Sequence, residues 1–180
     1  MIKQFVSLCI MSCAFLLTEA QPPSADKIMS DAYALAKKEN KNVIVIFHAS
    51  WCGWCRKMDK SMEDPSCKKF FDDNYITVHM VVDESPDKKN LENPGAGAFR
   101  DQYFGKGQGL PYWLVFDKDG NYLADSKIRK EGEGADAGEN TGCPATKEEV
   151  AHFIKVLMKT SALKEGELEI IENRFRKNEN

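Results

Sequence analysis

The sequence Trp-Cys-Gly-Trp-Cys at residues 51–55 constrains this chain more than any other feature, because it closely follows the apolar run 43–47. That run is β-branched and too short for a helix, which predicts a strand buried on both faces. A Cys-x-x-Cys pair at the start of the next helix places Cys52 at the positive end of the helix dipole, where the thiolate is favoured. Cys55 lies one turn further on. The spacing therefore predicts a disulfide that opens and closes, exchanging two electrons with another protein.

Composition limits both the size of the fold and the class of partner. With 180 residues, of which 42% are hydrophobic and 29% charged, the chain is long enough for one globular domain and too short for two. The formal net charge is −3. The sequence has no basic stripe with interleaved aromatic residues, so we expect no nucleic-acid partner.

Residues 1–20 resemble a secretory signal peptide, with Lys3 near the start and an apolar stretch over residues 5–17. The stretch is shorter than the roughly 20 residues that a membrane-spanning helix needs. We expect cleavage after Ala20, export to the periplasm or the medium, and no membrane span in the mature chain. Two alternatives stay open: a retained anchor, and a lipid anchor at Cys13. The lipid anchor is disfavoured because the apolar stretch continues past this cysteine.

Hydrophobic periodicity predicts alternating helices and strands after the signal segment. Asp-Lys-Asp-Gly at residues 117–120 indicates a hairpin turn between the last two strands. Threonine at the start of the last core helix, with glutamate three residues later, predicts a capping box. Helices are expected over residues 24–40, 53–62, 64–71, 93–104 and 146–163, and strands over residues 42–48, 75–82, 112–116 and 121–125.

Two segments fall outside this alternation. Residues 126–145 are expected to form a surface loop insertion, and their polar, glycine-rich part at 130–142 is expected to be mobile and to contribute nothing to the core. Residues 164–180 are expected to form a tail with a short helix that then frays. The domain itself is expected to span residues 21–163.

The order of these elements resembles the thioredoxin fold, an α/β fold with a central mixed sheet flanked by helices. Three features carry the resemblance in the same order along the chain. Residues 47–57 look like the active-site segment of the thioredoxin-like family, and Gly109-Leu110-Pro111 is similar to its cis-proline loop. The hairpin that ends in Asp119-Gly120 is the third feature.

The resemblance implies an enzyme, a protein disulfide oxidoreductase of the thioredoxin-like family. It implies that Cys52 is the exposed attacking thiol and that Cys55 is the more buried resolving thiol. Leu110 and Pro111 would bind an extended substrate segment by strand addition. Trp54 would offer an exposed apolar docking surface, whereas Trp51 is expected to pack against the fold.

The expected partners are protein thiols or disulfides and a redox partner that the sequence does not identify. No cofactor and no metal are implied, and we expect a monomer. The direction of electron flow stays open, because the two residues between the cysteines do not fix a reduction potential.

One position departs from the thioredoxin pattern. Ile46 stands six residues before Cys52, where thioredoxins carry a buried acid that assists the resolving thiol. His48 is a candidate substitute, since histidine titrates near neutral pH. The favoured interpretation of His48 is a structural residue at the end of a strand.

Two other functions compete with the oxidoreductase. A zinc site would use the cysteine pair, but structural zinc needs a second pair of ligands, and His79 and His152 are isolated in the sequence. A binding adaptor would use residues 130–142 for contact, but would have no need of both thiols.

Cys67 and Cys143 are the remaining cysteines after residue 20. Export would allow them to form a bridge if their Cα atoms lay within about 7 Å. We expect no bridge, because the resemblance places the two residues toward different ends of the fold.

Overall fold

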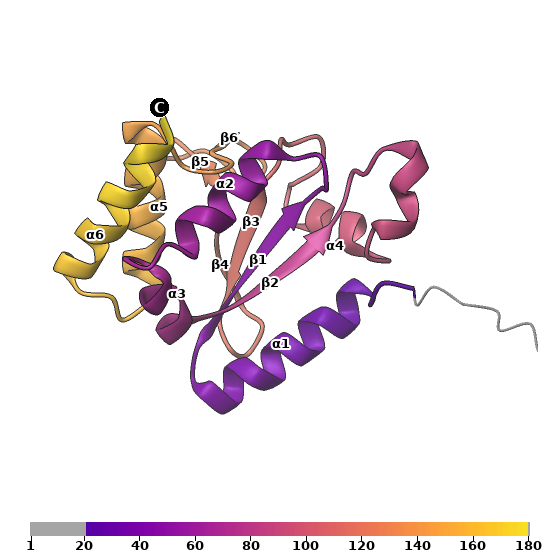
Figure 1. Cartoon of the computed structure of the whole chain (residues 1–180), viewed down its shortest axis with the longest axis horizontal. Helices are drawn as coiled ribbons and strands as arrows, with labels where there is room; N and C mark the ends of the chain where they lie inside the picture. Colours follow the sequence, from indigo (N-terminus) through magenta and orange to yellow (C-terminus); the bar gives the residue numbers. More distant parts are fainter. Residues whose placement is uncertain (1–20, 180) are drawn as a thin grey trace, which may run out of the picture.

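The computed structural model describes residues 21–179, so the predicted signal segment, with Cys9 and Cys13, lies outside the described residues. At its centre is a four-stranded sheet in the order β2-β1-β3-β4 (Figure 1). β1 pairs with β2 in parallel and with β3 antiparallel, so the sheet is mixed, as predicted. The strands are β1 (Asn42–His48), β2 (Tyr75–Val81), β3 (Tyr112–Phe116) and β4 (Tyr122–Asp125).

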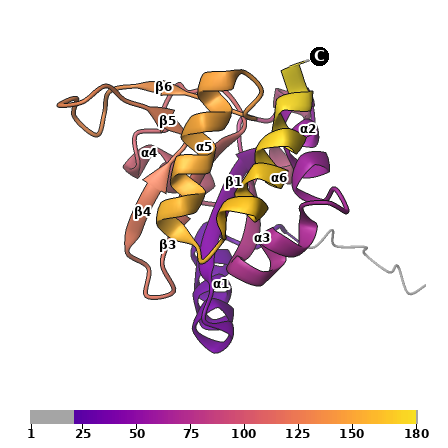
Figure 2. The same cartoon turned by 90° about the vertical axis from the view of Figure 1, so that its left-hand side faces the viewer.

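Helices cover both faces of this sheet (Figure 1). α1 and α4 pack on one face, and α2, α3, α5 and α6 pack on the other. Figure 2 shows α5 and α6 running beside each other on that second face. The helices are α1 (Ala25–Glu39), α2 (Gly53–Met62), α3 (Lys68–Asn74), α4 (Ala96–Gln102), α5 (Lys147–Thr160) and α6 (Glu165–Arg176), with short 3₁₀ helices η1 (Pro86–Leu91) and η2 (Lys177–Glu179).

β1 explains why two cores form. Successive side chains of a strand point to opposite faces of the sheet. Val43, Val45 and Phe47 therefore join the core beneath α1 and α4. Ile44 and Ile46 join the core beneath the other helices. Both faces of β1 are buried, as its continuous apolar run predicts.

Capping residues set the ends of the helices. The Ser24 hydroxyl accepts a hydrogen bond from the Lys27 amide at the start of α1, and Asn40 ends that helix in the left-handed region. At the start of α5, Thr146 and Glu149 form the predicted capping box. α3 begins only at Lys68, later than predicted, because the preceding residues form a separate turn.

The C-terminal segment is part of the core. Leu168, Ile171 and Phe175 on α6 lie buried in the core that also contains Ile44 of β1. Asn178 in η2 is buried as well. The expectation that the tail frays is therefore wrong for residues up to 179.

The insertion at residues 126–145 is more ordered than predicted. It forms a two-stranded antiparallel sheet of β5 (Lys127–Ile128) and β6 (Glu139–Asn140). Residues 131–136 are exposed, but Thr141 and Cys143 are buried. Within residues 130–142, Thr141 is buried and the Gly142 carbonyl oxygen accepts a hydrogen bond from the Trp113 indole of β3, so the end of this loop packs beside the sheet. The core residue Cys143 lies just beyond the loop.

In residues 21–179, no helix has both the length and the apolar character needed to cross a membrane.

Candidate active site

Cys52 and Cys55 form a disulfide at the N-terminus of α2. Their Cα atoms are 5.3 Å apart. Cys52 is the N-cap residue, and its sulfur accepts a hydrogen bond from the Cys55 amide at 3.1 Å. The unpaired amides of a first helical turn favour negative charge, so this position favours the Cys52 thiolate once the disulfide opens.

The two cysteines are almost equally buried in this oxidised form. Cys52 is 3% exposed and Cys55 is 2% exposed. They cluster with Ala49, and the Leu110 side chain packs against the cluster. The expectation that Cys52 is exposed is therefore wrong for the disulfide form, because the bonded sulfurs and Leu110 cover each other.

The loop that supplies Leu110 is held by the insertion. The Leu110–Pro111 peptide bond is cis, as the resemblance implies. The Asn140 side chain on β6 donates hydrogen bonds to the carbonyl oxygens of Gly109 at 2.7 Å and Pro111 at 3.1 Å. The side-chain oxygen Oδ1 of Asn140 accepts a hydrogen bond from the Gly142 amide at 3.0 Å. One side chain thus fixes both flanks of Leu110.

A groove of about 430 Å³ lies beside the disulfide. Trp54 and Leu110 line it, together with the start of α5 and the segment that follows β6. That segment includes Thr141 and Cys143. Pro111 is buried and lies outside the groove lining. Of the three predicted substrate contacts, the structure brings Trp54 and Leu110 together at the groove.

Both tryptophans of the motif are exposed. Trp54 is 50% exposed, as predicted, and the Lys57 ammonium group lies 4.5 Å from its ring centroid, in a cation–π contact. Trp51 is 57% exposed. Its indole N–H donates a hydrogen bond to the Asp83 carbonyl oxygen at 2.9 Å, which holds the ring at the surface. The expectation that Trp51 packs against the fold is therefore wrong.

A buried carboxylate that the sequence analysis missed holds the turn before Cys52. Glu84 is buried and accepts hydrogen bonds from the Ser50 amide and, at 2.8 Å, from the Ser50 hydroxyl. Next to it, Asp83 pairs with Arg100. The sequence held a signal for the contact between Glu84 and Ser50. Neighbouring parallel strands end at the same edge of a sheet, so residues that follow β1 and β2 lie close together.

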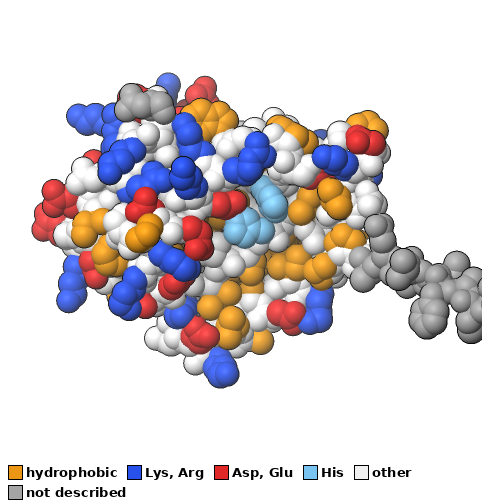
Figure 3. All heavy atoms as spheres, in the orientation of Figure 1, with side chains coloured by type: hydrophobic (Ala, Val, Ile, Leu, Met, Phe, Trp, Pro, Cys, Tyr) orange, Lys and Arg blue, Asp and Glu red, His pale blue; other side chains and the backbone are white. Residues whose placement is uncertain are grey.

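The face of β1 and β2 toward α2 carries two histidines. Ile46 is buried where a thioredoxin has its acid. The rings of His48 and His79 lie 5.3 Å apart, and His79 Nε2 lies 2.9 Å from the Asp59 carboxylate. Figure 3 shows two neighbouring histidine side chains at the surface. The structure thus brings His79, which is isolated in the sequence, next to His48. Burial, with His79 close by, lowers the pKa of His48, so this ring is neutral at pH 7.

Cys67 and Cys143 are both free and buried, so the expected absence of a bridge is confirmed. Burial raises the pKa of Cys143 to about 12 and also raises the pKa of Cys67. Both groups are protonated thiols at neutral pH and do not compete with Cys52 as nucleophiles.

His152 lies on α5, which packs on the same face of the sheet as α2, but it lies beside β4, where its Nε2 is 3.2 Å from the Asp125 carbonyl oxygen. Within residues 21–179, no three histidine, cysteine, aspartate or glutamate side chains gather in a way that could hold a metal ion.

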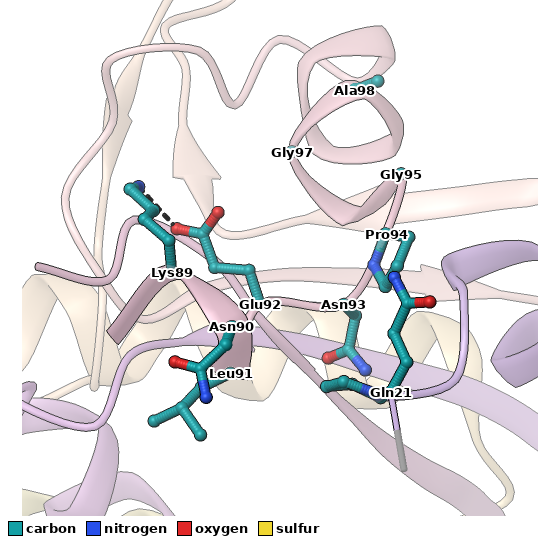
Figure 4. A pocket seen from close by; sticks show the side chains of 11 residues that line it. Gln21, Lys89, Asn90, Leu91, Glu92, Asn93, Pro94, Gly95, Gly97 and Ala98 are labelled. Carbon is teal, nitrogen blue, oxygen red and sulfur yellow. Dashed lines mark hydrogen bonds and ion pairs between the residues drawn. The ribbon is translucent and has the colours of Figure 1, made fainter. Parts of the chain in front are cut away.

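Another hollow of the surface lies away from the disulfide. It has a volume of about 910 Å³ and lies between η1, the start of α4 and Gln21 (Figure 4). Lys89 and Glu92 form an ion pair at its edge. None of its lining residues belongs to the disulfide, the cis-proline loop or the groove.

Comparison with known proteins agrees with this geometry. Residues 26–118 match the thioredoxin-like protein family. The thiol:disulfide interchange protein DsbD of Photorhabdus laumondii is 26% identical over 95 residues, which is 52% of this chain and 15% of DsbD. An uncharacterized protein of Caenorhabditis elegans is 32% identical over 62 residues, 34% of this chain and 8% of that protein. The chain thus spans a small part of the length of either relative.

Two solved structures are also similar. A disulphide isomerase from Xylella fastidiosa has a TM-score of 0.48 at 22% identity, covering 62% of this chain and 80% of that one. The C-terminal domain of DsbD from Neisseria meningitidis has a TM-score of 0.41 at 18% identity, covering 59% and 84%. The family match includes β1, the disulfide, the cis-proline loop and β3, and extends over more than half of the chain. The chain therefore belongs to the thioredoxin-like family and carries the Cys-x-x-Cys disulfide of its thiol-disulfide oxidoreductases.

Proposed function

We propose that this chain is an exported thiol-disulfide oxidoreductase that exchanges disulfides with protein substrates through Cys52 and Cys55. One observation carries the proposal: the Cys52–Cys55 disulfide stands at the N-terminus of α2, with Leu110 packed against it from the cis-proline loop. A structural disulfide would have no need of a helix terminus that favours its thiolate.

Disulfide exchange consists of two successive nucleophilic substitutions at sulfur. When the protein reduces a substrate, the Cys52 thiolate attacks one sulfur of the substrate disulfide, and the other substrate sulfur leaves as a thiolate and takes up a proton. The Cys55 thiolate then attacks the Cys52 sulfur. The Cys52–Cys55 disulfide forms, and the second substrate sulfur leaves as a thiolate. Two electrons pass to the substrate, and the reverse sequence oxidises a dithiol.

The cis-proline loop offers the groups for substrate recognition. Among residues 21–179, neither the amide nor the carbonyl of Leu110 forms a hydrogen bond. An extended substrate segment would pair with these two groups by strand addition. Trp54 and the groove beside it would then receive a neighbouring substrate side chain.

Trapping tests the proposal. Reduced protein is mixed with a disulfide-bonded protein such as insulin. Cys55→Ser should accumulate a Cys52–substrate disulfide, because the resolving thiol is gone, and Cys52→Ser should neither react nor trap. The matched control is Cys67→Ser, which changes a buried thiol away from the pair. Trapping by Cys52→Ser, or no exchange by the wild-type protein with any disulfide, would contradict the proposal.

Two further measurements address direction and export. The reduction potential of the Cys52–Cys55 pair assigns the direction of electron flow. Reductants of this fold have potentials of about −270 mV, and strong oxidants have potentials of about −120 mV. For export, the mass of the protein recovered after expression with its own N-terminus should correspond to a chain that begins at Gln21. A mass that includes residues 1–20, or a lipid on Cys13, would contradict the expected cleavage.

A further inference from the structure

A group of cations without carboxylate partners lies next to the disulfide. Arg56, Lys57 and Lys60 are on α2, and Lys177 is in η2. We call these four residues the basic ridge. Among the residues from 21 to 179, none of the four forms an ion pair with a carboxylate. Figure 3 shows positive side chains gathered over the part of the surface where Figure 1 places α2 and α6.

Three of the four acidic residues on or next to these elements pair with other cations. Asp64 pairs with Arg174 at 2.6 Å. Glu179 pairs with Arg176 at 2.6 Å. Glu63 pairs with Lys68 at 3.1 Å. Asp59 is the exception: it lies 2.9 Å from His79 on β2, which carries a charge only when protonated, so it offsets one of the four cations at most. The ridge therefore keeps a surplus of positive charge, although the chain as a whole has a formal net charge of −3.

Contacts within the protein fix the ridge beside the reacting sulfurs. The Arg56 guanidinium donates a hydrogen bond to the Ser50 carbonyl oxygen at 2.9 Å, just before the motif. The Lys57 ammonium group lies over the Trp54 ring and donates a hydrogen bond to the Asn178 carbonyl oxygen at 2.7 Å. That second bond joins α2 to η2, the element that carries the exposed Lys177. Arg56 and Lys57 therefore lie at the end of α2 that Cys52 caps, which a partner's disulfide must approach.

Isolated surface cations are usually only solvated, and a single one would carry little weight. Several uncompensated charges of one sign around a reaction site act differently. They steer oppositely charged partners and raise association rates by about 10-fold to 1,000-fold at low salt. Mobile ions screen this attraction over about 10 Å at 0.1 M salt.

We propose that the basic ridge docks acidic protein partners, in which aspartate or glutamate residues flank the reacting disulfide or thiol. This inference rests on the proposed function, because docking beside the sulfurs matters only if they exchange. It names the class of substrate that the exchange prefers.

Three peptides test the ridge. Each carries one cysteine activated as a mixed disulfide with thionitrobenzoate, and the cysteine is flanked by glutamate, serine or lysine. Attack by Cys52 on the mixed disulfide releases thionitrobenzoate, and its absorbance gives the rate. At 10 mM salt the glutamate peptide should react about 10-fold faster than the lysine peptide. At 1 M salt the difference should largely disappear.

A charge reversal away from the sulfurs isolates the effect. Lys60→Glu/Lys177→Glu should lose or invert the preference while keeping the rate with the serine peptide, since neither side chain touches the disulfide. The matched control is Lys38→Glu/Lys88→Glu on α1 and η1, away from α2, with the same change in net charge (Figure 1). The control should keep the preference for the glutamate peptide.

The outcomes separate the two proposals. Equal rates for the glutamate and lysine peptides at low salt would overturn the ridge while leaving the oxidoreductase intact. A preference retained by Lys60→Glu/Lys177→Glu but lost in the control variant would also overturn it. No reaction with any of the three peptides would contradict the proposed function itself.

Discussion

The region that matches the thioredoxin-like family, residues 26–118, and the region beyond it, residues 126–179, are built by different means. The first is ordered by strands buried on both faces, whose apolar residues alternate between two cores. The second packs the apolar faces of α5 and α6 on one of these cores, and it adds polar side chains that reach distant backbone groups, as Asn140 does at the cis-proline loop. The first region supplies the reacting sulfurs, and the second supplies one wall of the groove beside them. The reacting sulfurs thus lie within the family match, whereas part of the groove beside them lies outside it.

Asn178 shows how closely the second region approaches the site. Its side-chain amide donates hydrogen bonds to the Pro144 carbonyl oxygen at 3.2 Å and to the Cys143 sulfur at 3.5 Å. Its backbone carbonyl accepts the bond from Lys57 on the active-site helix. The end of the chain therefore supports both α2 and the groove.

The largest expected effect tests whether the second region is part of one cooperative core. Phe175→Ala should lower the free energy of unfolding by about 3–5 kcal/mol, because Phe175 is fully buried and its ring lies 4.9 Å from that of Phe153. Urea unfolding measures the change. Met158→Ala, at a position that is 63% exposed, should change it by less than about 0.5 kcal/mol. A loss for Phe175→Ala as small as the control's would show that α6 adds little to the core.

The next effect concerns the first region, at the turn before Cys52. Glu84→Ala should cost about 2–3 kcal/mol of unfolding free energy, because the Ser50 amide loses a charged partner in a buried position. Exchange should also slow, since the turn no longer fixes Cys52. Glu131→Ala on the exposed part of the insertion is the control. If stability and exchange rate are unchanged in Glu84→Ala, contacts other than those of Glu84 hold the turn before Cys52.

A smaller effect tests the contact between the two regions. Asn140→Ala removes two hydrogen bonds to the cis-proline loop and should lower the unfolding free energy by about 1–2 kcal/mol. The Cys52–Cys55 disulfide should still form, whereas exchange with a peptide substrate should slow as Leu110 loses its fixed position. Asn90→Ala in η1 serves as the control. Equal exchange rates for the two variants would mean that the insertion does not act on substrate binding.

The smallest effect is the pH dependence of stability. Burial lowers the pKa of both His48 and His152 below the ordinary value of 6.5. The unfolded state then binds more protons than the folded state below that pH. The two groups therefore contribute stability that is fully present above pH 6.5 and is lost as the pH falls toward their folded pKa values. His48→Gln should flatten the decline of unfolding free energy between pH 7 and pH 5.

The same variant tests the candidate base. If His48 accepts the Cys55 proton, His48→Gln should slow exchange between pH 6 and pH 8 and change the shape of the pH profile. A profile parallel to that of the wild-type protein would leave His48 with a purely structural role.

The parts of the fold that sequence predicts are those that local patterns encode. The strands at 42–48 and 112–116 appear with the predicted bounds, because continuous apolar runs that end in polar or turn residues mark buried strands. The capping box at Thr146 and the hairpin at 117–120 depend only on neighbours in the sequence. The cis-proline came from the resemblance, and the structure confirms it.

What sequence missed depends on contacts between distant residues. Glu84 meets Ser50 only because β1 and β2 are parallel and end together. Trp51 stays exposed because its indole finds the Asp83 carbonyl oxygen at the surface. The order of β6 depends on the acceptors that the cis-proline loop presents to Asn140. Parallel pairing of the two strands could have indicated the first contact, but no periodicity or spacing in one sequence encodes the other two.

The placement of the three tryptophans has a practical consequence. Trp51 and Trp54 are exposed beside the disulfide, whereas Trp113 is buried, with its ring 5.4 Å from that of Phe153. Opening the disulfide changes the environment of the first two indoles, and unfolding changes that of the third. The tryptophan fluorescence of the wild-type protein therefore reports on two processes. The two exposed indoles report on the redox state of the disulfide, and the buried indole reports on folding.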